Sequence, residues 1–169
     1  MTTFSLRRVR LRSGEEYQDE QEVVLEPLEV GGQRYLAVPD RLRASLTIVQ
    51  ATTGRVLELR FDARLHGPCQ RCLADAVIEQ ELAAREYHAA DPAADEELRS
   101  PYVRDDQLDL SGWARDALAL ALPDQILCRP DCAGLCAICG RDLNLEPHEH
   151  HEEHVDPRWS ALEQLRERL

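Results

Sequence analysis

Six cysteines, arranged as two close pairs with two further cysteines between them, constrain this chain more than any other feature. They stand as Cys69-x2-Cys72 and then Cys128-x3-Cys132-x3-Cys136-x2-Cys139. In a tight turn, two thiolates separated by two residues can face one tetrahedral metal ion, and Gly140 after Cys139 relieves the steric limits of such a turn. One pair alone is a weak signal, but two pairs with two further cysteines predict zinc binding.

Two histidines downstream bring the number of candidate ligands to eight. The predicted zinc ligands are Cys69, Cys72, Cys128, Cys132, Cys136, Cys139, His148 and His150. The partition that we favour places the first four in one site and the last four in a second site. One rival is a ribbon-like site from Cys69, Cys72, Cys136 and Cys139, and another is a local site from the last four cysteines. Because space rather than chain order determines a four-ligand shell, the sequence leaves all three partitions open.

Other interpretations of these residues have less support. The tract from His148 to His154 also fits a solvated segment that binds metal weakly. The cysteine spacings differ from those usual for iron–sulfur clusters, and the βαβ context of a redox C-x-x-C motif is missing. No nucleophile elbow, phosphate-binding loop or H-E-x-x-H word is present, and four thiolates close a zinc shell without leaving a position for water. We therefore expect a structural metal, no catalytic residues and no enzyme.

Composition bears on the redox state of the cysteines. The chain has 169 residues, of which 43% are hydrophobic, which is enough for one core. No apolar run approaches the roughly 18 residues that cross a bilayer. Residues 1–12 carry arginines but no apolar stretch of the secretory type. We therefore expect a cytoplasmic protein with no membrane partner, a setting in which structural disulfides are rare and cysteine clusters more often bind metal.

The net charge of −12 is unevenly distributed. Residues 1–75 hold eleven arginines and eleven acids, so residues 76–169 carry the whole excess of acid. A net acidic chain binds nucleic acid poorly without a local basic face. Alternation along an expected strand would place Arg8, Arg10 and Arg12 on one face, and with Arg71 they are candidate contacts to RNA or to a partner. A solvated strand face balanced by nearby acids is the alternative.

Hydrophobic patterning predicts an antiparallel sheet in the first half of the chain. We expect strands over 4–12, 23–30, 33–38, 44–51 and 55–65, with a loop over 13–21. The clearest signal is the hairpin of 44–51 and 55–65, which surrounds a short turn containing Gly54. Residues 77–87 fit a returning strand or a helix, and residues 89–99 read as an acidic loop.

Two helices are expected further along. Ser111 caps a predicted helix over 111–122 that Pro123 ends, and Asp156 caps a second over 157–168. The second carries an apolar stripe of Trp159, Leu162, Leu165 and Leu169. The expected fold is α+β: an antiparallel β-sheet domain with a packed helix over 1–124, then a zinc-knotted segment and terminal helix over 125–169.

Four pieces of sequence resemble the YceD family. They are Cys69-Gln70-Arg71-Cys72-Leu73, the helix running into Leu122-Pro123, the stretch from Leu127 to Gly140 with Asp142-Leu143-Asn144, and Asp156-Pro157-Arg158-Trp159 with Leu162 and Leu165. They occur in the family's order over about residues 20–169. Members with a fully developed tail carry a C-x-C pair where His148 and His150 stand here, which supports the second site.

The resemblance implies a role in the accumulation or processing of 23S ribosomal RNA, and hence in assembly of the large ribosomal subunit. We therefore expect a non-enzymatic assembly factor with structural zinc. Its partner would be ribosomal RNA or a large-subunit intermediate, contacted directly or through a ribosomal protein. A thiol or zinc redox sensor and a metal-dependent RNA-processing enzyme remain alternative hypotheses.

Overall fold

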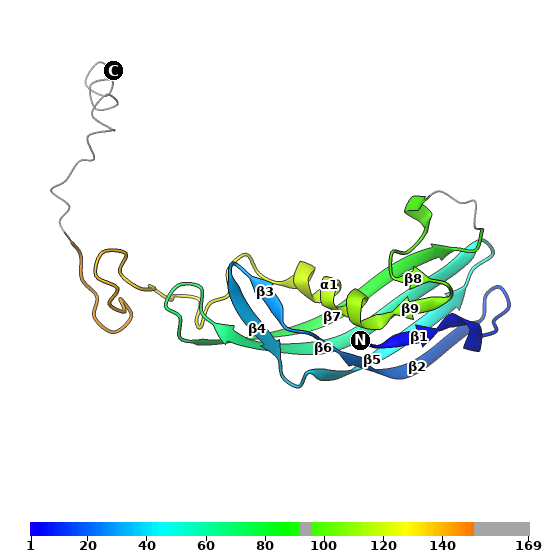
Figure 1. Cartoon of the computed structure of the whole chain (residues 1–169), viewed down its shortest axis with the longest axis horizontal. Helices are drawn as coiled ribbons and strands as arrows, with labels where there is room; N and C mark the ends of the chain where they lie inside the picture. The colour runs from blue at the N-terminus through cyan, green and yellow to red at the C-terminus, as the bar shows by residue number, and fades with distance from the viewer. Residues whose placement is uncertain (92–95, 151–169) are drawn as a thin grey trace, which may run out of the picture. The chain divides into compact units, whose positions relative to one another are not determined.

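The computed structural model describes residues 1–91 and 96–150 (Figure 1). Over these residues the protein is mostly antiparallel β-sheet with one α-helix. The chain divides into two compact units, Met1–Cys132 and Ala133–Leu169. The domain boundary expected after residue 124 stays a prediction, but Ile126 and Cys132 are buried in the core of the first unit.

Three long strands form the centre of the first unit. They are β5 (Arg41–Gln50), β6 (Gly54–Pro68) and β7 (Asp75–Ala89). The expected hairpin is present, because β5 and β6 pair antiparallel around the turn before Gly54. The ambiguous segment over 77–87 is a strand, and β7 pairs with β6 along the full length of both.

Shorter strands complete the sheet. On the outer side of β5 lies β2 (Glu16–Val24), while β4 (Gln33–Ala37) pairs with β6 near its end and with β3 (Leu28–Val30). A separate three-stranded sheet joins β1 (Thr3–Ser5), β9 (Gln107–Asp109) and β8 (Val103–Arg104). Two 3-10 helices, Leu6–Arg8 and Glu96–Leu98, lie outside the sheets.

Alternation along the strands produces the core. In β6, every second residue from Leu57 to Leu65 is buried, whereas the polar residues that alternate with them point to the other face. The helix α1 (Leu110–Ala121) adds Trp113 and Leu118 to the same core. Figure 1 shows α1 running along β7, with which it is in contact. Burial of this apolar surface is the main stabilising contribution to the first unit.

Three sequence expectations in this part of the chain are wrong. The strand expected over 4–12 ends at Ser5, because the 3-10 turn that follows buries both Leu6 and Val9, three residues apart on one side. The loop expected over 13–21 is mostly strand β2, a polar edge strand that pairs with β5 throughout. The helix is capped by Asp109, not by Ser111, whose buried hydroxyl instead accepts the N–H of Thr2.

Other expectations lie outside the part of the chain that the structure describes. The terminal helix over 157–168 and its apolar stripe are among the residues not described, as are residues 92–95 of the acidic loop. No helix among the described residues combines the length and the apolar character needed to cross a bilayer.

Candidate metal centre

The turn between β6 and β7 carries the first cysteine pair. The N–H of Cys69 donates to the carbonyl of Ala74 at 2.7 Å, and the N–H of Leu73 donates to the carbonyl of Cys69 at 2.9 Å. Leu73 has a φ of 63°, in the left-handed region. These bonds fold the turn so that both thiols face the same side, toward the segment that follows α1.

The Cys136–Cys139 turn in the second unit has the same hydrogen bonds. Here the N–H of Cys136 donates to the carbonyl of Arg141 at 2.8 Å, and the N–H of Gly140 donates to the carbonyl of Cys136 at 2.8 Å. Gly140 has a φ of 73° at the position equivalent to Leu73. Glycine adopts this conformation without steric cost, whereas leucine does not, so only the first turn carries backbone strain.

The first cluster consists of four cysteine sulfurs. Cys69 and Cys132 lie 3.8 Å apart between Sγ atoms, and Cys72 and Cys128 lie 3.6 Å apart. All four sulfurs lie within 4.8 Å of one another. A regular tetrahedron of zinc–sulfur bonds of about 2.3 Å has edges of roughly 3.8 Å, so both short distances fit a four-thiolate zinc shell.

Backbone and side-chain contacts tie the two halves of this cluster together. Gln70 donates its N–H to the carbonyl of Ile126 at 2.8 Å and accepts the N–H of Ile126 on its side chain at 3.1 Å. Arg71 donates to the side-chain oxygen of Gln125 through Nε and Nη2, at 3.0 and 2.8 Å, and to the carbonyl of Cys132 through Nη1 at 3.0 Å. The two residues inside the Cys69–Cys72 turn therefore hold the segment that supplies the other two cysteines.

The surroundings of the sulfurs favour the thiolate form of Cys69. Burial raises the pKa of the Cys69 thiol, but backbone N–H groups of Cys72, Arg71 and Cys128 outweigh it and lower the pKa to about 6. The hydrogen bond with Cys72 and then burial raise the pKa of Cys128 to about 12. A divalent cation among the sulfurs would favour deprotonation of the remaining thiols.

The second cluster joins two cysteines to two histidines. Cys136, Cys139, His148 and His150 place one ligand atom each within 4.8 Å of the others. The Cys139 Sγ lies 3.1 Å from the Nε2 of His148, whose Nδ1 lies 2.7 Å from the carbonyl of Glu146. A proton on Nδ1, donated to that carbonyl, leaves the Nε2 lone pair for a metal, which is the usual orientation of a ligand histidine.

The electrostatic environment of this cluster favours a thiolate, which can bind a cation. The backbone N–H groups of Cys139 and Ile138 lower the pKa of the Cys136 thiol to about 6. The backbone around this cluster is also held in place, because the N–H of Leu143 donates to the carbonyl of Gly134 at 2.9 Å. The two clusters are the two sets favoured from the sequence, and neither rival partition corresponds to one of them. That they hold zinc stays a prediction.

The arginines proposed as partner contacts lie in different settings. Arg8 ends the 3-10 helix, and Arg10 and Arg12 follow it, all three exposed. They lie on no common strand, so the alternation argument for a shared arginine face is wrong. Arg71 is exposed, but its guanidinium is already hydrogen-bonded to Gln125 and to the carbonyl of Cys132 at the four-cysteine cluster. Contact of any of the four with RNA stays a prediction.

Sequence reasoning missed the residues that brace the first cluster. Tyr35, on β4, is fully buried and donates its hydroxyl to the carbonyl of Pro68 at 2.8 Å, directly before Cys69. The sequence pattern likewise predicts no role for Gln70 or Gln125. The only sequence signal for these contacts is that both residues inside the first C-x2-C motif, Gln70 and Arg71, are polar. The partners of Gln70 and Tyr35 are distant in sequence, so local patterns do not predict them.

Comparisons with known proteins agree with the cysteine pattern. The chain is 40% identical over 103 residues to the uncharacterized protein Rv2926c of Mycobacterium tuberculosis, covering 59% of this chain and 49% of the relative. It is 36% identical over 99 residues to the uncharacterized protein ML1660 of Mycobacterium leprae, covering 56% and 45%. It is 29% identical over 116 residues to YlbN of Bacillus subtilis, an uncharacterized protein, covering 64% and 66%.

The mycobacterial matches thus span about half the length of those relatives. No solved structure matches the chain. The model of one family, described as large ribosomal RNA subunit accumulation protein YceD, matches residues 57–166, which include all six cysteines and both histidines of the two clusters. The chain therefore belongs to the YceD family.

Proposed function

We propose that this protein is a non-enzymatic assembly factor that supports the accumulation or processing of 23S ribosomal RNA, and that two structural zinc ions fix its cysteine-rich segments. Family membership carries the ribosomal part, because the family is named for accumulation of the large-subunit RNA and not for a catalytic activity. The two clusters carry the metal part. The partner would be ribosomal RNA or a large-subunit intermediate in the cytoplasm.

The burial pattern supports a structural role for the second metal. Over residues 133–150 no apolar side chain is buried, and Leu135, Ile138 and Leu145 are 36%, 57% and 80% exposed. A segment of this length without buried apolar surface does not offset the conformational entropy lost on folding. Metal ligation supplies that free energy in small domains of this kind.

The chemistry of the ligands supports zinc. Thiolate and imidazole are its preferred ligands, in closed tetrahedral shells of four when the site is structural. Cys69, Cys72, Cys128 and Cys132 would fill one shell, leaving no position for a reacting water. Zinc would neutralise the thiolates and fix the turn between β6 and β7 against the segment after α1.

The metal assignment is tested by elemental analysis of the purified protein, where we expect about two zinc ions per chain. The double variant His148→Ala and His150→Ala should retain about one, held by the four cysteines. The matched control replaces His151 and His154, which stand outside both proposed shells, and should keep both ions. Loss of zinc in the control, or one ion per chain that is insensitive to His148 and His150, contradicts the two-site assignment.

The ribosomal role is tested by deleting the gene and measuring mature 23S relative to 16S RNA. We expect the ratio to fall and the unsubstituted gene to restore it. The variant Cys72→Ser, which removes one thiolate of the first cluster, should restore it poorly. An unchanged ratio in the deletion strain, in slow and in fast growth, contradicts the role. Cleavage of precursor 23S RNA by the purified protein would instead favour the RNA-processing enzyme.

A thiol redox sensor is a second candidate, favoured by the exposure of Cys139 in the second cluster. Exposed zinc-bound thiolates are accessible to oxidants, and their oxidation would release the metal. Zinc release at physiological peroxide, coupled to a change in partner binding, would favour this function. Retention of both ions under that treatment contradicts it.

A further inference from the structure

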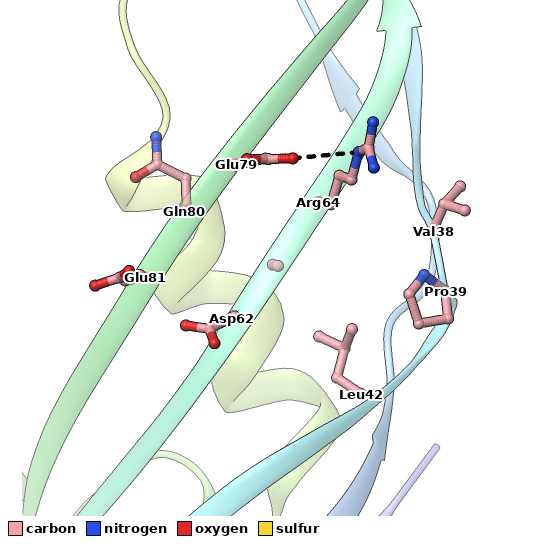
Figure 2. Close-up of a pocket in the computed structure, with 9 residues that line it drawn as sticks. Val38, Pro39, Leu42, Asp62, Arg64, Glu79, Gln80 and Glu81 are labelled. Atoms are coloured by element: carbon pink, nitrogen blue, oxygen red, sulfur yellow. Dashed lines mark ion pairs between the residues drawn. The ribbon is translucent and has the colours of Figure 1, made fainter.

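A groove in the first unit lies where β5 and β4 leave β6. The pairing of β5 with β6 ends at Ala44 opposite Phe61, and the pairing of β4 ends at Ala37 opposite Leu65. Val38 still donates its N–H to the carbonyl of Arg64 at 2.9 Å, but the chain over 39–43 is not paired with β6, and the space beside it has a volume of about 810 Å³. Figure 2 shows the groove from the face opposite α1.

One wall of the groove is apolar. It is formed by Val38, Pro39 and Leu42, which Figure 2 shows on the same side of β6. Val38 is 49% exposed although it is a large apolar residue, while Leu42 is only 5% exposed. The wall therefore presents apolar surface to solvent above a buried base.

The other wall is acidic, and its charges are only partly compensated. Arg64 on β6 is directly opposite Glu79 on β7, and the two form an ion pair of 3.5 Å. In the neighbouring pair, Asp62 is directly opposite Glu81. Among the described residues, the carboxylates of Asp62 and Glu81 have no ion pair and no side-chain hydrogen bond, and like charges directly opposite each other destabilise a sheet.

The geometry points to a docking site for an extended cationic segment of a protein partner. We propose that a lysine or arginine side chain of that segment lays its aliphatic stem on Val38 and Pro39 and places its charged group between Asp62 and Glu81. Long basic side chains combine these two properties, and a cation there relieves the repulsion between the opposed carboxylates. The phosphates of RNA would meet two uncompensated negative charges, so the groove disfavours RNA.

This proposal goes beyond the assembly role and does not depend on it. It assigns a partner chemistry to a surface formed by β4, β6 and β7, distinct from both cysteine clusters. An acidic surface of this kind suits the basic segments of proteins that themselves bind nucleic acid.

The test is a titration of the full-length, zinc-loaded protein with a short fluorescein-labelled peptide that alternates arginine with valine, at physiological ionic strength. The peptide should bind with saturation, and Asp62→Asn with Glu81→Gln should weaken it roughly tenfold, whereas Glu16→Gln with Glu20→Gln on β2 should change it little. The control pair removes the same charge from exposed positions on another strand.

The apolar wall is tested by a second matched pair. Val38→Ser should weaken binding of the peptide, and Leu36→Ser, at a residue of similar exposure that does not line the groove, should not. Circular dichroism spectra and thermal unfolding of each variant establish that the fold is retained. If the double variant at Glu16 and Glu20 weakened binding of the peptide as much as the double variant at Asp62 and Glu81, net charge alone would attract the peptide. That result would overturn the proposal. Competition by a short single-stranded RNA for the same site would also overturn it.

Discussion

Replacing Gly67 by alanine should destabilise the first unit and disturb the β6–β7 turn. Gly67 lies near the end of β6, two residues before Cys69. An alanine Cβ at this position would lie 2.7 Å from the Cε1 of Tyr35, nearer still to its Cδ1, and 3.0 Å from the carbonyl oxygen of Arg34. Contacts this short do not persist, so either the ring or the two strands must move.

The magnitude follows from how little freedom the ring has. Tyr35 is fully buried, and its hydroxyl is held by the carbonyl of Pro68 at 2.8 Å. The backbone of Arg34 blocks the other direction. We therefore place the cost near the upper end of the usual range for overpacking, about 3 kcal/mol. With a shift of roughly 2–4 °C per kcal/mol for a protein of this size, the unfolding temperature should fall by roughly 6–12 °C.

The assay is thermal and urea unfolding, in excess zinc, of a double-mutant cycle with Tyr35→Leu, which replaces the rigid ring by a smaller, flexible side chain and removes Cε1. Gly67→Ala should cost much less in the Tyr35→Leu background than in the original protein. Equal costs in the two backgrounds would show that steric conflict with Tyr35 is not the cause. A loss below about 0.5 kcal/mol in the original protein would also refute the reasoning.

Three other substitutions test separate parts of the structure. Asp109→Ala removes the cap that accepts the N–H of Gly112 at 3.0 Å and should lower the free energy of unfolding by about 1 kcal/mol, measured in urea. Arg71→Lys keeps the charge but loses the planar fork, and should weaken zinc retention against a chelator roughly tenfold. Burial, and then the carboxylate of Asp116, raise the pKa of Tyr102 from 10.0 to about 12. The free energy of unfolding should therefore fall as pH rises through this range, and Tyr102→Phe should reduce the fall.

Local patterns predicted the parts of the fold in which the sequence carries its own periodicity. The alternating apolar residues of β5 and β6 identified the hairpin, because a buried strand face must repeat every second residue. The cysteine spacing predicted the two turns Cys69–Cys72 and Cys136–Cys139 for a similar reason, since each turn of four residues brings its own pair of thiols together. The pairing of Cys72 with Cys128 at 3.6 Å was a choice among alternatives, and the sequence could not rank them by distance.

Features that depend on distant partners escaped prediction. The polar strand β2 has little apolar alternation of its own and is held by the backbone of β5 through the whole of its length. The 3-10 turn at Leu6 forms because Leu6 and Val9 both reach the core, which the sequence of 4–12 does not reveal. The groove between Val38 and Asp62 likewise exists only because two pairings of β6 end near each other.

The two cysteine turns have the same hydrogen bonds, but only the Cys69–Cys72 turn joins two paired strands. The paired strands β6 and β7 already fix Cys69 and Cys72, so metal in the first cluster would mainly attach the segment carrying Cys128 and Cys132. Over residues 133–150, the described part of the second unit, no sheet fixes the cysteines and no apolar side chain is buried.

This contrast accounts for the residue that follows each pair. The sheet around the first turn can hold Leu73 in a left-handed conformation, because the stability of the long hairpin offsets the cost of about 1–2 kcal/mol. The second turn lacks such support, so Gly140 avoids the cost altogether. Removal of metal should accordingly unfold the second unit first, while the β-sheet of the first unit keeps its structure and loses the attachment of its last two cysteines.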